Sequence, residues 1–188
     1  MRIIAGKHRG RKLLPPEGDV TRPITDRVKQ SLFDILAPLI PDAVIYDCFA
    51  GTGSMGLECL SRGAKAVTFF EADRSAVGRL KRNIAAVDDE HCCEVVAGDL
   101  FRWFANVSPG NKADLIFLDP PYRFLRERCD DLRQLAQRFA NVHLAPGGTV
   151  IFRHDANDSL ELPGLQHYDL RQYGGMTLEF LSPKTPGR

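Results

Sequence analysis

The sequence predicts an α/β fold, built on a mostly parallel sheet with one antiparallel strand. Short apolar runs alternate with amphipathic segments along most of the 188 residues, as in a chain of strand–helix units. Acidic residues follow several of these runs, at the sheet edge where open α/β folds bind ligands. The chain ends in two further runs joined by Gly174-Gly175, the tight turn of an antiparallel hairpin.

Length and composition fit one main domain with its own core, at 44% hydrophobic and 26% charged residues. No run approaches the roughly 18 apolar residues of a membrane span, and Met1-Arg2 leads into a mixed basic stretch rather than a signal peptide. The five cysteines show neither metal-type nor disulfide-framework spacing. We therefore expect a cytoplasmic protein with reduced cysteines, without a metal site or a membrane partner.

The overall charge of +1 hides a basic N-terminus. Residues 1–29 hold eight Lys or Arg against three acids, a net of +5, while the remainder holds 17 basic and 21 acidic residues. A basic arm on a mildly acidic body favours binding of a polyanion at one end, and a merely solvated terminus is the alternative. The candidate contacts to nucleic acid are Lys7, Arg9, Arg11, Lys12, Arg22 and Arg27.

The N-terminal extension, residues 1–20, is predicted to be a hairpin whose strands at 2–6 and 11–14 flank a basic tip. The main domain is expected over 21–182 and a frayed tail over 183–188. A helix should begin at Thr25 or Asp26, with Thr25 as its cap. Its apolar face is formed by Val28, Leu32, Ile35, Leu36 and Leu39.

A glycine-rich turn follows the first predicted core strand, residues 43–47. A helix through Leu60 and a second strand over 66–70 give this turn the context of a nucleotide site. Glu71 ends the second strand and suits a ribose, because a carboxylate accepts hydrogen bonds from both hydroxyls. The turn spells G-x-G-x-x-G, which permits tight turning and close approach of a ligand, with Gly51, Gly53 and Gly56.

The charge of Asp47 helps to choose between cofactors. The glycine pattern also fits a nicotinamide oxidoreductase, or a turn that binds no ligand. Asp47 stands just before the glycines, where a pyrophosphate would otherwise meet the helix N-terminus. A carboxylate repels pyrophosphate but attracts the ammonium and sulfonium of S-adenosylmethionine, which favours the methyl donor.

The rest of the chain continues the strand–helix alternation. Residues 144–148 read as a turn, and Arg79 is expected on the solvent face of its helix. Asp99 follows the third strand, where it could bond an adenine amine, cap the next helix through Phe104, or do both. The predicted helices are 73–87, 100–104 and 129–140, and the predicted strands are 93–97, 115–118, 149–152, 165–173 and 176–181.

Asp119-Pro120-Pro121-Tyr122 follows a buried strand of four apolar residues. An exocyclic base amine is a poor nucleophile, so it needs acceptors that hold its hydrogens and turn its lone pair toward the electrophile. A carboxylate and a proline carbonyl can supply these acceptors, and a tyrosine can stack on an extracted base. The alternative is an ordinary Asp-Pro turn with a packed tyrosine.

With these motifs, nearly the whole chain resembles the RsmD family of bacterial methyltransferases, which modify the guanine N2 amine of 16S, small-subunit ribosomal RNA. The specific signatures are residues 1–7, 9–13 and 21–28, whereas Asp47 to Gly53 and Asp119 to Tyr122 look like amino-methyltransferases in general. The resemblance implies a Rossmann-like class I S-adenosylmethionine-dependent methyltransferase with a seven-stranded sheet. Its partner would be small-subunit RNA, free or in a partly assembled particle.

The resemblance also implies the site. Asp119, Pro120, Pro121 and Tyr122 would hold the guanine. Arg153 departs from the family, where an acidic residue is more typical, and the role of segment 173–177 is left open. The rival functions are methylation of DNA adenine or a protein amide, and a non-catalytic RNA-binding assembly factor. The implied cofactor contacts are Asp47, Phe49, Ala50, Gly51, Gly53, Gly56, Glu71, Asp99 and Leu100.

Overall fold

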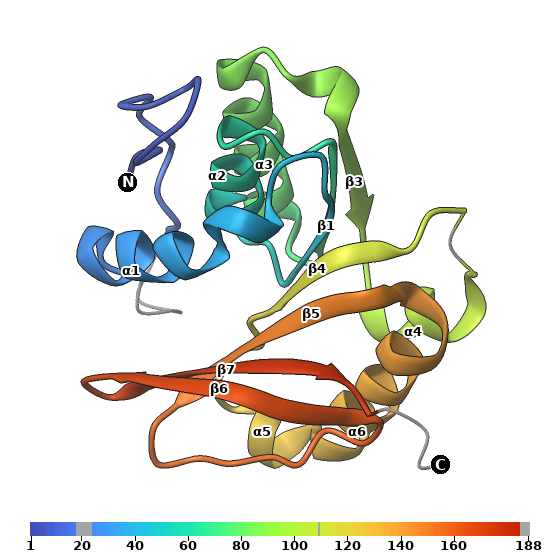
Figure 1. The fold of residues 1–188 in the computed structure, drawn as a ribbon. Helices are drawn as coiled ribbons and strands as arrows, with labels where there is room; N and C mark the ends of the chain where they lie inside the picture. The colour runs from blue at the N-terminus through green and yellow to red at the C-terminus, as the bar shows by residue number, and fades with distance from the viewer. Residues whose placement is uncertain (18–23, 109, 185–188) are drawn as a thin grey trace.

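The computed structural model describes residues 1–17, 24–108 and 110–184 (Figure 1). Within them a seven-stranded sheet runs in the order β3-β2-β1-β4-β5-β7-β6, and β7 is antiparallel to both of its neighbours. This topology confirms the predicted fold class. The strands are β1 (Val44–Cys48), β2 (Ala66–Glu71), β3 (Cys93–Ala97), β4 (Ala113–Leu118), β5 (Leu144–Asp155), β6 (Leu165–Tyr173) and β7 (Met176–Pro183).

Helices cover both faces of the sheet, because side chains of the central strands alternate between two apolar clusters. In β4, Leu115 and Phe117 join the cluster of α1, α2 and α3, whereas Ile116 and Leu118 join that of α4 and α6. The helices are α1 (Asp26–Leu36), α2 (Ser54–Ser61), α3 (Arg74–Val87), α4 (Leu100–Asn106), α5 (Phe124–Glu127) and α6 (Cys129–Arg138), with short turns η1 (Ala37–Leu39), η2 (Glu90–Cys92) and η3 (Phe139–His143).

Several predicted details were wrong. The turn expected at 144–148 lies within β5: Leu144 pairs with Ala113 and Thr149 with Leu115 of β4, so the register shifts across 145–148. Leu39 lies past the end of α1 and is 42% exposed. Arg79 is buried rather than solvated, and its guanidinium pairs with Glu17.

The N-terminal arm, residues 1–14, forms a hairpin with a single antiparallel bridge, Arg2 to Lys12, rather than two regular strands. Ile3 and Leu13 bury their side chains against the body. The Ile3 carbonyl accepts from the Gly10 amide at 2.9 Å, which closes the hairpin. The arm is therefore folded onto the domain.

A buried charge network anchors this arm to α1 and α2. The carboxylate of Glu58 accepts hydrogen bonds from the backbone amides of Ile4 and Ala5, at 2.8 and 3.0 Å. Lys29 and Arg62 pair with the same carboxylate at 3.0 and 2.9 Å. Because a buried carboxylate is stable only when paired, arm and helices hold each other in place.

Two predictions concern residues that lie partly outside the described ranges. The boundary between extension and main domain, at 20 and 21, lies in the undescribed range 18–23, and most of the predicted tail, 185–188, lies beyond the description. At the start of that tail, Pro183 ends β7 and the Lys184 amide donates to the Gly164 carbonyl at 2.9 Å. In the described part of the chain, no helix combines the length and apolarity needed to cross a bilayer.

Candidate active site

Acidic residues lie at the carboxyl ends of four neighbouring parallel strands. Asp47 is on β1, Glu71 ends β2, Asp99 follows β3 and Asp119 follows β4, and these strands stand in the order β3-β2-β1-β4. The same edge carries the glycine turn between β1 and α2. The topology therefore assembles the predicted cofactor residues and the Asp-Pro-Pro-Tyr turn along one edge of the sheet.

Asp47 is the most deeply placed of these acids, with 2% of its surface exposed. Its Oδ2 accepts a hydrogen bond from the Gly56 amide at 2.9 Å, within the first turn of α2. Burial raises the pKa of the carboxyl to about 7, and the charges of Asp119 and Glu71 act in the same direction. Ionisation of this buried carboxyl group is unfavourable, so a bound cation would stabilise its charged form.

The glycine turn is organised by Glu71 as well as by its own flexibility. The Gly51 amide donates to Glu71 Oε2 at 2.7 Å, and the Asp73 amide donates to Oε1 at 2.8 Å. Gly53 has a φ of 80°, a left-handed conformation that favours glycine. At Gly56, a Cβ would come within 2.4 Å of the Phe69 ring, so this glycine permits close packing of α2 on β2.

The neighbouring predicted contacts have structural partners of their own. The Ala50 amide donates to the Phe70 carbonyl at 2.9 Å. Asp99 is exposed and caps α4 by accepting from the Phe101 amide at 2.9 Å, which confirms the capping role. Leu100 is buried directly behind this cap.

Phe49 belongs to an aromatic cluster that sequence reasoning missed. Phe49 has a φ of 61°, which is uncommon for a bulky residue. Its ring lies 5.9 Å from that of Phe101 and 5.8 Å from that of Phe124, and the Arg128 guanidinium lies 4.1 Å from the Phe101 centroid. The signal available was an aromatic residue soon after three of the four acidic strand ends: Phe49 after Asp47, Phe101 after Asp99 and Phe124 after Asp119.

The Asp-Pro-Pro-Tyr turn leads directly into α5. The Pro121 and Tyr122 carbonyls accept from the Phe124 and Leu125 amides at 2.8 and 3.2 Å, which fixes the turn. Pro120 is buried, while Pro121 and Tyr122 are half-buried.

Asp119 is 25% exposed at its side chain and pairs with Arg153, whose Nε lies 2.6 Å from Oδ1. Burial raises the pKa of Asp119, and the Arg153 charge opposes that rise. The sequence singled out Arg153 as a departure from the family but did not predict this ion pair.

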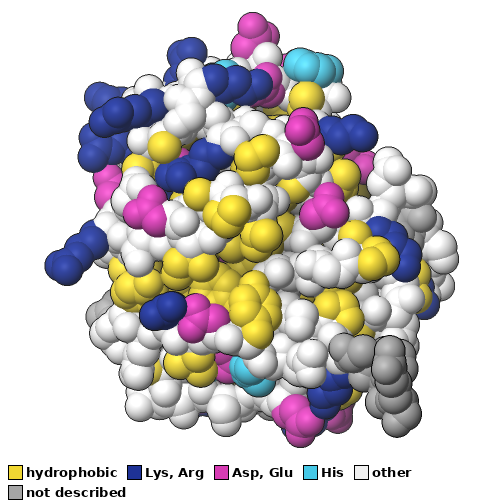
Figure 2. Space-filling view, viewed as in Figure 1, with side chains coloured by type: hydrophobic (Ala, Val, Ile, Leu, Met, Phe, Trp, Pro, Cys, Tyr) yellow, Lys and Arg dark blue, Asp and Glu magenta, His cyan; other side chains and the backbone are white. Residues whose placement is uncertain are grey.

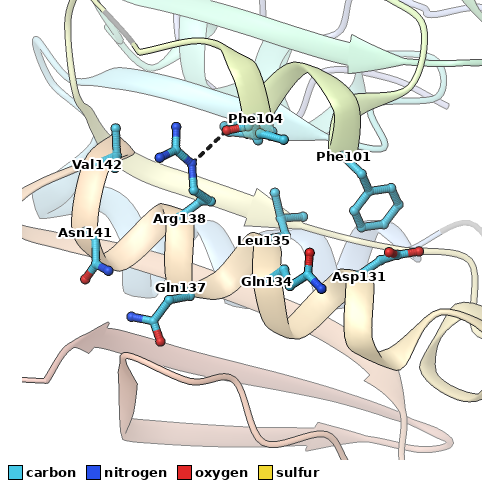
Figure 3. Close-up of a pocket in the computed structure, with 10 residues that line it drawn as sticks. Phe101, Phe104, Asp131, Gln134, Leu135, Gln137, Arg138, Asn141 and Val142 are labelled. Atoms are coloured by element: carbon cyan, nitrogen blue, oxygen red, sulfur yellow. Dashed lines mark hydrogen bonds between the residues drawn. The ribbon is translucent and has the colours of Figure 1, made fainter.

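A separate hollow of about 390 Å³ lies between α4 and α6 (Figure 3). Arg138 crosses it and donates from Nε to the Phe104 carbonyl at 2.9 Å. None of the predicted cofactor or catalytic residues lines this hollow. Its size alone therefore does not assign it a role in the chemistry of the strand edge.

The predicted nucleic-acid residues gather on the arm, where Figure 2 shows Lys and Arg side chains crowded at the upper left, over the N-terminal segment of Figure 1. Arg9, Arg11 and Lys12 are exposed, and Lys7 is 54% exposed although its ammonium pairs with Asp89 at 2.8 Å. The arm residues from Lys7 to Lys12, with Ala86 of α3, line a hollow of about 610 Å³. Arg27 is exposed on α1, and Arg22 lies outside the described residues.

Within residues 1–17, 24–108 and 110–184, no group of three or more His, Cys, Asp or Glu is placed to hold an ion.

Replacing Asp47 by Asn is expected to stabilise the protein at pH 8. The amide keeps an acceptor for the Gly56 amide and removes a buried charge. The folded-state pKa of about 7 lies above the ordinary 3.8, so the wild type loses stability as pH rises from about 4 to about 7.

The advantage of Asp47→Asn should therefore grow over that range, to a few kcal/mol at about 1.4 kcal/mol for each pKa unit. Urea unfolding at pH 5 and pH 8 measures it. The exposed Asp130, replaced by Asn, is the control. A variant less stable than wild type at pH 8 would contradict the burial argument.

The chain is similar to known proteins in both fold and sequence. The chain is similar to a solved structure titled as a putative methyltransferase, yhhF, from Escherichia coli, with a TM-score of 0.83 and 34% identity over 97% of each chain. It is 43% identical over 123 residues to ribosomal RNA small subunit methyltransferase D of E. coli K12, covering 65% of this chain. The match spans 61% of the relative's length.

A relative from Bacillus subtilis, named putative rRNA methyltransferase YlbH, is 33% identical over 166 residues and covers 87% of this chain and 86% of the relative. The family described as conserved hypothetical protein 95 matches residues 1–182. The chain therefore belongs to this family, the RsmD family that its opening motifs predicted.

Proposed function

We propose that the protein transfers a methyl group from S-adenosylmethionine to the exocyclic N2 amine of a guanine in small-subunit ribosomal RNA. The observation that carries the proposal is the pairing of two features on adjacent strands: the buried Asp47 on β1 and the Asp119-Pro120-Pro121-Tyr122 turn after β4. One feature suits a cationic cofactor and the other suits an amine. The names of the E. coli and B. subtilis relatives support ribosomal RNA as the substrate.

The residues of the glycine turn fit S-adenosylmethionine better than a dinucleotide. The Asp47 side chain accepts from the Gly56 amide, so an acidic group already occupies the N-terminus of α2. A pyrophosphate would be repelled there, whereas an ammonium or sulfonium would be attracted. Glu71 would meet the ribose, and Asp99 with the neighbouring Leu100 would meet the adenine.

When bound, S-adenosylmethionine would supply a methyl group for direct transfer from sulfur to the amine nitrogen, and the amine proton would leave to solvent. The chain's own task is to orient the amine. Asp119 and the Pro120 carbonyl would accept its two hydrogens, which turns the lone pair away from the ring. Tyr122 would stack on the guanine base after that base has been extracted from its stack in the RNA.

The proposal of guanine N2 comes from the resemblance to the RsmD family, since the Asp-Pro-Pro-Tyr turn could hold any exocyclic base amine with two hydrogens. Adenine N6 offers the same two hydrogens. The basic arm adds support for a nucleic acid, because its exposed arginines can reach phosphates. The substrate would be free small-subunit RNA or the same RNA in a partly assembled particle.

Asp119→Ala is expected to lower methyl transfer to small-subunit RNA by about 10²–10³-fold, because one oriented acceptor is lost. Affinity for S-adenosylhomocysteine, measured by calorimetry, should persist. The matched control is Asp130→Ala on α6, an exposed acid. Turnover of Asp119→Ala equal to that of the control would remove Asp119 from the mechanism.

The double change Arg9→Ala and Arg11→Ala should weaken RNA binding and flatten its dependence on salt. Each lost phosphate contact should lower the slope of log affinity against log salt by about 0.7–0.9. The comparison is Arg133→Ala with Arg171→Ala, two exposed arginines on α6 and β6. If both double variants give the wild-type slope, the arm does not contact the RNA.

A further inference from the structure

Arg153 forms an ion pair with the proposed amine acceptor, across two neighbouring strands. Leu118 of β4 pairs with Phe152 of β5, so the next residues, Asp119 and Arg153, come side by side. The Arg153 Nε lies 2.6 Å from Asp119 Oδ1, and Arg153 is only 9% exposed. This contact involves one carboxylate oxygen, and Asp119 has a second, Oδ2, with which to accept a hydrogen from an amine.

The C-terminal hairpin holds Arg153 from the other side. Arg153 pairs with Leu178 of β7, and its Nη1 lies 3.7 Å from the Met176 Sδ. The hairpin is itself tied to α1, because the Tyr173 and Ser31 hydroxyls are hydrogen-bonded at 2.7 Å. Met176 of segment 173–177, whose role the sequence left open, therefore contacts the guanidinium.

Burial explains why a cation is needed beside Asp119, because burial raises the pKa of its carboxyl group. The charges of Asp119 and of Glu71 on β2 in turn raise the pKa of Asp47 on β1, so this edge already carries neighbouring acids. Lys29 on α1 acts on Asp47, while Arg153 on β5 acts directly on Asp119 and also interacts with Tyr122 of the same turn. Arg153 is thus the cation in contact with the acceptor.

We propose that Arg153 is a positioning residue for methyl transfer: it holds Oδ1 of Asp119, keeps that carboxylate ionised, and leaves Oδ2 to orient the amine. This inference rests on the proposed function, since it assigns Asp119 the role of acceptor. It also gives the departure from the family a purpose. A neutral side chain at 153 would leave the buried carboxylate of Asp119 without its ion pair, and Asp119 would take up a proton.

The test is the pH profile of methyl transfer for wild type, Arg153→Met and Arg153→Lys. In Arg153→Met the acidic limb of kcat should move to higher pH by about 1–3 units, the usual effect of losing an adjacent opposite charge. KM for S-adenosylmethionine should change little. Arg153→Lys keeps the positive charge but lacks the planar guanidinium. The acidic limb of its kcat profile should therefore lie nearer to that of wild type than the limb of Arg153→Met does.

The matched control is Arg133→Met, which breaks an exposed arginine–aspartate pair on α6 and should leave the profile unchanged. Calorimetry with S-adenosylhomocysteine checks that each variant is folded. A folded Arg153→Met with the wild-type acidic limb would overturn the proposal while the proposed function stands.

A second readout does not depend on activity. The ¹³C shift of the Asp119 carboxyl, titrated by NMR and assigned with Asp119→Asn, should show a higher midpoint in Arg153→Met than in wild type. Absence of methyl transfer by wild type would refute the proposed function, and the titration would still decide the ionic role of Arg153. Equal midpoints would refute that role.

Discussion

The structure depends on keeping carboxylates buried at the C-terminal edge of a parallel sheet. Burial alone would neutralise Asp47, whose pKa is raised to about 7, and the same force acts on Asp119. The fold compensates with an amide from Gly56 and a guanidinium from Arg153. These partners offset only part of the cost of burying the charges, since the pKa of both acids remains raised. A cation such as a sulfonium would therefore be attracted to this edge.

Helix α2 connects this edge to the basic arm. Its first turn presents Gly56 to Asp47, and two residues later Glu58 binds the backbone of the arm. Lys29 pairs with Glu58 and also favours the ionised form of Asp47. The arm is therefore held on the same helix as the cofactor turn, which gives the RNA-binding proposal a fixed geometry relative to the methyl donor.

Periodicity predicted most helices and strands, because each is set by local alternation of apolar residues. It also placed Asp47, Glu71, Asp99 and Asp119 at strand ends. It could not predict the pairing of Arg153 with Asp119, because 34 residues separate them and only the sheet order brings them together. The same limit applies to the ion pair of Arg79 with Glu17. It applies also to residues 144–148, because the pairing of Leu144 and Thr149 with β4 includes Pro146-Gly147-Gly148 in β5 as an irregular stretch.

Identification of the methylated nucleoside tests the central claim most directly. The protein would be incubated with S-adenosylmethionine and unmethylated small-subunit RNA, both free and in assembled particles, and the digested nucleosides would be separated by mass spectrometry. We expect N2-methylguanosine, and its yield from free RNA and from assembled particles identifies the preferred substrate. N6-methyladenosine would keep the orientation of an amine by Asp119 but contradict the assigned base, and no methylated nucleoside from either substrate would contradict the account as a whole.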